Sequence, residues 1–316
     1  MPDSSFGGLW NTLMLKLNKT PPFLYDVVKK EKPDLIHGHF GLDSYRLLGL
    51  KQTFNLPFIV NFYGYDVLRL PEEFGWKRRY RTLAKEGDLF FVGSEDMKSN
   101  VVGLSFPEEK IKVLKLGMNL DEIRFEQRTA AGPNLMMVGR MVEKKGFKYA
   151  VKAVNLLKEK GIVIRLDLYG DGALRPELEQ LTSKLDINDQ VTFHGQTENQ
   201  VIFKELYRHD ILLVPSVQAA DGDREGIPQT TVEGMATGIP VVASSHAGLP
   251  ELIIHEETGL QVPERDASGL ADAIQRYMEE DSLVSKVSKN GRHRVEQEHN
   301  ISTQVHKAEE WYKSII

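Results

Sequence analysis

The chain has 316 residues, of which 41% are hydrophobic and 27% charged, and it carries a net charge of −5, a composition typical of a globular protein with room for two domains. The absence of cysteine excludes disulfides, a thiolate metal site and a cysteine nucleophile, and the acidic balance gives no support to nucleic-acid binding. No apolar run approaches the roughly 18 residues of a membrane span, and residues 1–5 lack signal-peptide character, so the sequence predicts a cytoplasmic protein.

The first part of the chain alternates helical and strand patterns. Two helices are expected within residues 9–32, and further helices near 43–54, 75–86 and 95–103. Continuously apolar strands are expected at 34–40, 57–64, 88–94 and 111–117. This alternation indicates a parallel sheet covered on both faces. Four strands are fewer than the about six that complete such a domain, so the first domain is expected to be incomplete.

One dense basic cluster stands in the helix expected near 75–86. It reads Trp76-Lys77-Arg78-Arg79-Tyr80-Arg81. A solvated helix face is the more common explanation of such a run. A patch that meets anionic lipid headgroups is the alternative, in which each basic residue contributes about 1 kcal/mol.

The polar residues 124–133 are expected to link the first domain to a second, complete one. The sequence thus predicts an N-terminal domain at 1–130, a C-terminal domain at 131–285, and amphipathic helices at 286–316 that pack back toward the first domain. In the second domain, strands are expected at 134–138, 165–170, 190–194, 211–216, 240–245 and 259–262, and helices near 146–159, 175–185, 199–208, 228–237, 248–254 and 266–280.

The run from Glu225 to Glu233 joins one apolar strand of this domain to a helix start. Pro228 suits the first helical position, because proline has no N–H to lose there. Free N–H groups and the positive dipole end of a helix attract phosphate, and Gly226 allows a ligand to approach closely. Glu225 and Glu233 lie at most about 12 Å apart by helical rise. A ligand with hydroxyls on both sides of a phosphate would match, and a nucleotide sugar is built in this way.

The loop after the first strand of the second domain contains two cations. Arg140 offers a planar fork of donors and Lys145 a point charge, which together suit a diphosphate. Strand ends in open α/β sheets are where ligands collect. Ordinary surface cations are the competing explanation.

Three further strand-end loops point to the same edge of the sheet. Tyr169-Gly170-Asp171-Gly172 either lets backbone approach a ligand or is only a tight turn. Phe193-His194-Gly195-Gln196 could flank a nucleobase through backbone groups, although a surface role is simpler for the His194 side chain. Residues 244–251 end at a helix start that could also bind a diphosphate.

Together the motifs resemble the retaining glycosyltransferases of the two-Rossmann (GT-B) type, family 4. The motifs are Gly139-Arg140-x4-Lys145-Gly146, Gly170-x-Gly172, Glu225-x7-Glu233 and Ala247-Gly248-Leu249-Pro250-Glu251. In the first domain, residues 33–41 and 62–66 are most similar to exopolysaccharide transferases of the colanic-acid or amylovoran kind. The resemblance implies an α/β fold of two Rossmann-like parallel-sheet domains that face each other across a cleft, the first shortened at its N-terminus.

The resemblance also implies an activity and its partners. Such enzymes transfer a hexosyl group, with retention of configuration, from a nucleotide-diphosphate sugar to a glycan acceptor. We expect a UDP- or GDP-linked donor, a lipid-linked or oligosaccharide acceptor, peripheral contact with the cytoplasmic face of the inner membrane, and no required metal or other cofactor.

Site residues follow from the resemblance position by position. Glu225 would hold hydroxyls of the transferred sugar, Arg140 and Lys145 would bind the diphosphate, and Tyr63 would lie near the reacting carbon, where many relatives have histidine. Glu233 would bind the ribose diol, and the other donor-binding positions would be Gly139, Gly172, His194, Gly195, Gly226 and Ile227. His39 and Asp66 would line the acceptor side.

Two departures from the family pattern, the missing glycine-rich loop and Tyr63 in place of histidine, keep other classes of function open. The glycine-rich loop that such enzymes have after their first strand has no counterpart, unless Phe6-Gly7-Gly8-Leu9 is its remnant. The short first domain and Tyr63 would also suit a non-catalytic nucleotide-sugar-binding or partner subunit. A nucleotide-sugar epimerase is a third hypothesis, with His39 as its acid or base.

Overall fold

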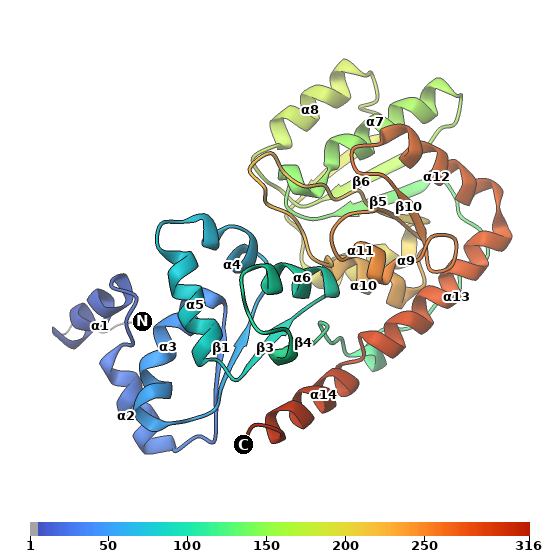
Figure 1. The fold of residues 1–316 in the computed structure, drawn as a ribbon. Coiled ribbons are helices and arrows are strands. Elements are labelled where there is room, and N and C mark those ends of the chain that lie inside the picture. The colour runs from blue at the N-terminus through green and yellow to red at the C-terminus, as the bar shows by residue number, and fades with distance from the viewer. Residues whose placement is uncertain (1–5) are drawn as a thin grey trace. The chain divides into compact units, whose positions relative to one another are not determined.

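The computed structural model describes residues 6–316; the segment from Met1 to Ser5, for which the sequence predicts no signal-peptide character, lies outside the described residues. The chain divides into two compact units. Unit 1 comprises the described residues up to Lys115 together with Val305–Ile316, and unit 2 is Leu116–Gln304. Each unit is built on a parallel sheet (Figure 1), which confirms the predicted class of two α/β domains.

Unit 1 contains a four-stranded sheet in the order β1-β2-β3-β4. Its strands are β1 (Ile36–His39), β2 (Phe58–Asn61), β3 (Leu89–Val92) and β4 (Ile111–Val113). Its helices are α1 (Phe6–Lys16), α2 (Pro22–Glu31), α3 (Gly41–Phe54), α4 (Tyr65–Leu68), α5 (Trp76–Glu86) and α6 (Glu95–Gly103), with 3-10 turns at Leu70–Glu72 and Glu108–Lys110. Every strand lies within the range that its apolar run predicts.

The two faces of this sheet are covered by different parts of the chain. On one face, helices α3, α5 and α6 bury side chains such as Leu48, Leu83 and Val101 against Phe58 and Phe90. On the other face, Ile59, Leu89 and Phe91 pack against Trp311, Tyr312 and Ile315 of the C-terminal segment. The helix concerned is α14 (Ile301–Lys313). A chain segment from the far end of the sequence therefore completes the core of unit 1.

Unit 2 contains a six-stranded sheet in the order β10-β9-β8-β5-β6-β7. Its strands are β5 (Asn134–Val138), β6 (Arg165–Tyr169), β7 (Val191–Gly195), β8 (Ile211–Val214), β9 (Val241–Ser244) and β10 (Leu260–Val262). Its helices are α7 (Phe147–Glu159), α8 (Arg175–Lys184), α9 (Asn199–Arg208), α10 (Gln229–Thr237), α11 (Leu249–Leu252), α12 (Ala267–Glu279) and α13 (Asp281–Glu298), with 3-10 turns at Leu120–Glu122 and Glu143–Lys145.

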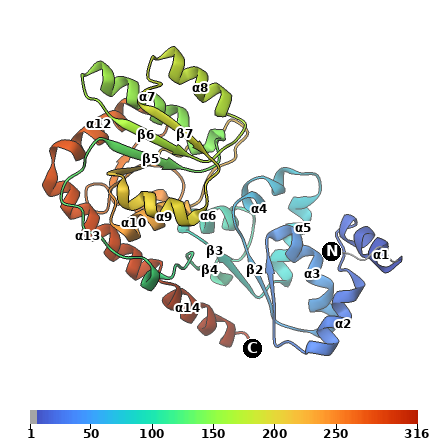
Figure 2. The same cartoon turned by 180° about the vertical axis from the view of Figure 1, so that it is seen from behind.

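This sheet is covered on both faces, as its continuously apolar strands predict. Helices α7, α8 and α12 pack on one face, around Val151, Leu178 and Ile274. Helices α9, α10 and α11 pack on the other, around Leu206 and Met235. Figure 2 shows α7, α8 and α12 on one side of β5, β6 and β7, and α9 and α10 on the other. The strand order reverses between β5 and β8, and ligands in such sheets bind at the carboxyl ends of the strands beside this reversal.

The boundary between the units differs from the expected one at residue 130. Residues 116–128 belong to unit 2, where Leu120 and Ile123 are buried in its core. The backbone N–H of Arg128 donates to the hydroxyl of Ser288 at 2.9 Å. The polar character of residues 124–133 thus reflects a surface segment that is bound to unit 2. The second boundary falls after Gln304, within α14, and not at 285.

The N-terminal segment 6–9 lies in helix α1 and not in a loop that follows a strand. It therefore has no likeness to the glycine-rich loop considered for Phe6-Gly7-Gly8-Leu9. In residues 6–316, none of the helices combines the length and the apolar character that crossing a membrane requires.

Candidate functional site

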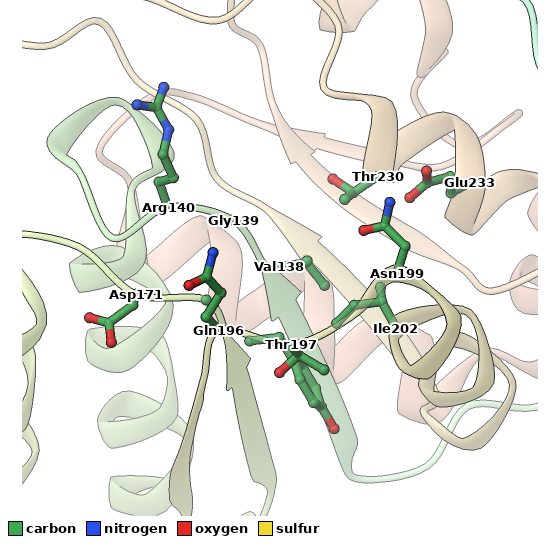
Figure 3. A pocket seen from close by; sticks show the side chains of 12 residues that line it. Val138, Gly139, Arg140, Asp171, Gln196, Thr197, Asn199, Ile202, Thr230 and Glu233 are labelled. Carbon is green, nitrogen blue, oxygen red and sulfur yellow. The ribbon is translucent and has the colours of Figure 1, made fainter.

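Unit 2 has a pocket of about 360 Å³ at the carboxyl ends of β5, β6 and β7. The loops after these three strands form part of its wall, and helices α9 and α10 form the rest. Its lining consists of Val138, Gly139, Arg140, Tyr169, Gly170, Asp171, Gln196, Thr197, Asn199, Ile202, Thr230 and Glu233. Figure 3 shows Thr230 and Glu233 on one helix facing Asn199 and Ile202 on the other, with Arg140 extending from the loop after β5.

Glu233 is the acidic group on the α10 side of this pocket. The residue is only 7% exposed, on a helix whose other face packs in the core. Burial raises the pKa of its carboxyl, and a hydrogen bond with Gln229 offsets part of this effect. A carboxylate with so little solvation gains from hydroxyl donors brought by a ligand.

Glycines bring the loops after β5 and β6 into close contact. Gly139 and Gly170 have φ angles of +152° and +125°, which favour glycine. A Cβ atom on Gly170 would lie 1.9 Å from the carbonyl oxygen of Gly139. One on Gly172 would lie 2.6 Å from the carbonyl oxygen of Met141. Gly139 and Gly170 thus line the pocket, whereas Gly172 is required for loop packing behind it.

The side chain of His194 does not line the pocket and is bound within the protein instead. Its Nε2 atom lies 2.5 Å from Asp167, and its ring stacks on Tyr169 at 4.4 Å. His209 bonds the other oxygen of Asp167 at 3.1 Å. Gly195 ends β7, and the pocket is lined by the residues that follow it, Gln196 and Thr197.

Glu225 lies in the loop between β8 and α10, where two lysines bind its carboxylate. Lys144 and Lys145 approach its two oxygens at 3.2 Å each. Burial acts to raise the pKa of Glu225, but the two ammonium groups outweigh it and hold the pKa below its usual value. Lys144, which sequence reasoning did not single out, also pairs with Asp223 at 3.1 Å.

A buried histidine fixes the backbone of Glu225. The Nε2 atom of His246 accepts from the Glu225 N–H at 3.2 Å, and its Nδ1 atom lies 2.6 Å from Glu264. Glu264 also accepts from the N–H of Gln218 at 2.9 Å, in the same loop as Glu225. Neither His246 nor Glu264 was assigned a role from sequence, since no spacing rule links them to Glu225.

The remaining donor-side candidates differ in their surroundings. Within the described part of the chain, the exposed Arg140 side chain has no hydrogen-bond or ion-pair partner. A Cβ atom on Gly226 would meet open space, so packing does not require glycine there. Ile227 packs against the core beneath α10. Pro228 precedes α10 as its N-cap, one residue before the expected position.

In unit 1, Tyr63 and His39 form a pair at the carboxyl ends of β2 and β1. The Tyr63 hydroxyl lies 2.5 Å from Nδ1 of His39. Burial, with smaller effects of Asp66 and Tyr312, raises the pKa of Tyr63, so the phenol keeps its proton. His37 stacks on His39 at 4.6 Å, and burial together with His39 lowers the pKa of His37 to about 4.

Asp66 is buried beneath these residues and does not face a ligand. Its carboxylate accepts from the N–H groups of Gly41, Tyr63 and Gly64 at 2.9, 3.0 and 2.9 Å. Asp66 therefore ties the loop after β1 to the loop after β2. Across residues 6–316, no three histidine, aspartate or glutamate side chains gather in a way that could hold a metal ion.

Two parallel-sheet α/β units, one with a pocket beside its strand-order reversal, define the GT-B class of fold. Solved structures of this class are similar to the chain. Anabaena Alr3699/HepE in complex with UDP superimposes with a TM-score of 0.80, at 18% identity, over 93% of this chain and 82% of that one. A sucrose-phosphate synthase (tll1590) from Thermosynechococcus elongatus gives a TM-score of 0.77, at 24% identity, over 92% and 76%.

The chain belongs to the glycosyl transferases group 1, whose family pattern it matches over residues 120–294, and it is a glycosyltransferase. Residues 5–122 match Glycosyltransferase Family 4. The amylovoran biosynthesis glycosyltransferase AmsK of Erwinia amylovora is 33% identical over 88% of this chain and 68% of its own length. The putative colanic acid biosynthesis glycosyltransferase WcaL of Escherichia coli K12 is 34% identical over 85% and 68%.

Proposed function

We propose that this glycosyltransferase transfers a hexosyl group, with retention of configuration, from a nucleotide-diphosphate sugar to a lipid-linked glycan in exopolysaccharide biosynthesis. The pathway is suggested by the two relatives, which are named for amylovoran and colanic acid biosynthesis. UDP is the first nucleotide of the donor to test, because similar structures hold UDP and UDP-glucose. GDP is the alternative.

The observation that carries the proposal is that the pocket of unit 2 contains both a buried carboxylate and a guanidinium that is free, within the described residues, to bind a ligand. Glu233 brings a buried carboxylate, and Arg140 brings a guanidinium without a partner among residues 6–316. A nucleoside diphosphate offers matching groups, since its ribose hydroxyls donate to a carboxylate and its phosphates accept from a guanidinium. Gly139 and Gly170 let the loops after β5 and β6 pack closely where they form the wall of this pocket.

Glu225 and Lys145 would serve the reacting end of the donor. Glu225 would accept hydrogen bonds from the sugar, while Lys145, with Arg140, would stabilise the charge that grows on the departing diphosphate. The bond between the anomeric carbon and the phosphate oxygen breaks, and the acceptor oxygen forms its bond on the same face. The acceptor proton passes to the leaving phosphate oxygen, so no protein nucleophile is needed.

Unit 1 would bind the acceptor, and its basic helix α5 would meet the membrane that carries it. Trp76 and Tyr80 are buried, whereas Lys77, Arg78 and Arg81 are exposed beside the fully exposed Phe74. Each of these cations would contribute about 1 kcal/mol near an anionic surface. Cosedimentation with phosphatidylglycerol vesicles, but not with phosphatidylcholine vesicles, is expected, and Arg78→Glu should weaken it.

A transfer assay with radiolabelled nucleotide sugar and a lipid extract tests the activity. We expect glycolipid product from the wild type, a loss of at least about 100-fold in Glu225→Gln and Arg140→Ala, and no effect of EDTA. Normal activity in either variant would remove its proposed role. Nucleotide binding without transfer to any acceptor would indicate a non-catalytic subunit. A new nucleotide sugar formed without acceptor, seen by NMR, would indicate an epimerase.

A further inference from the structure

Unit 1 carries a cluster of half-exposed rings at the carboxyl ends of β1 and β2. Phe40 and Tyr63 are 45% and 48% exposed, and their ring centroids lie 4.6 Å apart. The imidazole of His39 lies parallel to the Tyr63 ring, with 5.9 Å between centroids and 19° between planes. We call these three residues the ring cluster. Grouped aromatic side chains that remain accessible are a feature of binding surfaces.

The ring cluster is held in place by polar contacts below it. The buried carboxylate of Asp66 binds the N–H groups of Gly41, Tyr63 and Gly64, which fixes the two loops that carry Phe40 and Tyr63. The Tyr63 hydroxyl forms a hydrogen bond with the His39 imidazole. A ligand would therefore find the rings already ordered, which lowers the entropy cost of binding.

The backbone of Phe40 gives an independent sign of function. Phe40 has φ +63° and ψ 138°, a conformation that a bulky residue adopts only under strain. The fold keeps a phenylalanine there although the residue is not buried in the core. Strain of this kind concentrates at ligand-binding sites, where the position of a side chain matters more than stability.

We propose that the ring cluster binds a neutral sugar ring of the acceptor glycan. The apolar C–H face of a pyranose would lie on Phe40 and Tyr63, and the Tyr63 hydroxyl and the His39 imidazole would bond its hydroxyls at the edge. The carboxylate of Asp66 is already occupied by three N–H groups, so it offers no free charge to an ionic ligand, and the exposed rings favour a neutral one. This assignment rests on the proposed function, because it takes the acceptor to be a glycan.

Saturation-transfer NMR on the full chain tests the assignment, with the methyl glycosides of glucose, galactose, mannose and fucose as probes. We expect saturation of the ring C–H protons of at least one glycoside. Phe40→Ala and Tyr63→Ala should each reduce it about fivefold, as the loss of one stacked ring predicts. Tyr63→Phe should lose less, because it keeps the ring. Phe23→Ala is the matched control, since Phe23 is 49% exposed in unit 1 but lies on α2, before the amino end of β1.

The outcomes separate this inference from the donor proposal. Absence of saturation in every glycoside, or equal saturation in wild type and both alanine variants, would overturn the ring cluster as a sugar site. Uridine saturation that Phe40→Ala abolishes would also overturn it, in favour of a nucleobase. UDP binding is read separately, as a thermal shift that depends on unit 2. If that shift is absent while glycoside binding persists, the donor proposal fails and the sugar site stands.

Discussion

The Nε2 atom of His246 accepts a hydrogen bond from the backbone N–H of Glu225 at 3.2 Å. Because Nδ1 of the same ring lies 2.6 Å from Glu264, the imidazole bridges the loop that carries Glu225 to the end of β10. The ring itself is buried, at 1% exposure, so its two nitrogen atoms depend on these partners and not on water. The position of the Glu225 carboxylate, and with it the sugar end of the proposed donor site, depends on this bridge.

Two replacements of His246 distinguish its hydrogen-bonding role from its contribution to packing. Glutamine has both an acceptor and a donor, so His246→Gln should keep part of the bridge. His246→Leu would leave the Glu225 N–H unpaired and should lower the free energy of unfolding by about 2 kcal/mol. Circular dichroism of the whole chain during urea unfolding would measure this loss. In titration calorimetry, His246→Leu should weaken the binding of UDP-glucose more than the binding of UDP. Equal behaviour of the two variants would contradict a bridging role.

Glu233→Gln should stabilise the free protein and weaken nucleotide binding. Burial raises the pKa of Glu233 in the folded state. Such a group favours folding only at low pH, and its contribution is lost as pH rises through the folded pKa, so at pH 7 the charge opposes folding. Removing it should raise the melting temperature and reduce the affinity for UDP about tenfold or more. A lower melting temperature, or unchanged UDP affinity, would argue against a carboxylate kept for a ligand.

The sequence predicted the secondary structure better than it predicted the contacts within the site. Continuous apolar runs and helix signals placed the strands of both sheets, because burial on two faces leaves little freedom in such segments. Glu225 and Glu233 were correctly placed before and within a helix. For His194, the sequence favoured a side chain without a ligand role, but it did not reveal the partner, Asp167 on a neighbouring strand. The bridge through His246 and Glu264 joins three separate loops, and no local pattern encodes such a contact.

Acid should destabilise unit 2 through Glu225 and Glu264. Burial opposes ionisation of both, but Lys145 and Lys144 at Glu225, and the hydrogen bonds of Glu264 with His246 and Gln218, lower each pKa overall. A lowered folded pKa gives stability that is present above the usual value of 4.5 and is lost as pH falls through the folded pKa.

The measurement is the melting temperature of the chain by circular dichroism between neutral pH and pH 3. The double variant Glu225→Gln, Glu264→Gln should be less stable at pH 7 and lose part of the decline below pH 4.5. Glu309→Gln, which changes an exposed carboxylate on α14, serves as control and should follow the wild type. An unchanged decline in the double variant would show that other groups dominate acid unfolding.

Strain at Phe40 should be visible as a difference between two small replacements. Phe40→Ala and Phe40→Gly both remove the ring, but only alanine keeps a Cβ atom at φ +63°. Releasing the strain is worth about 1–3 kcal/mol, and the extra backbone freedom of glycine in the unfolded chain costs about 0.5–1 kcal/mol. Phe40→Gly should therefore be more stable than Phe40→Ala by about 1 kcal/mol. Tryptophan fluorescence during urea unfolding reports on unit 1, because Trp10, Trp76 and Trp311 all lie there. If alanine proves equal to or better than glycine, the backbone at Phe40 is not strained, and the case for a sugar site loses its independent support.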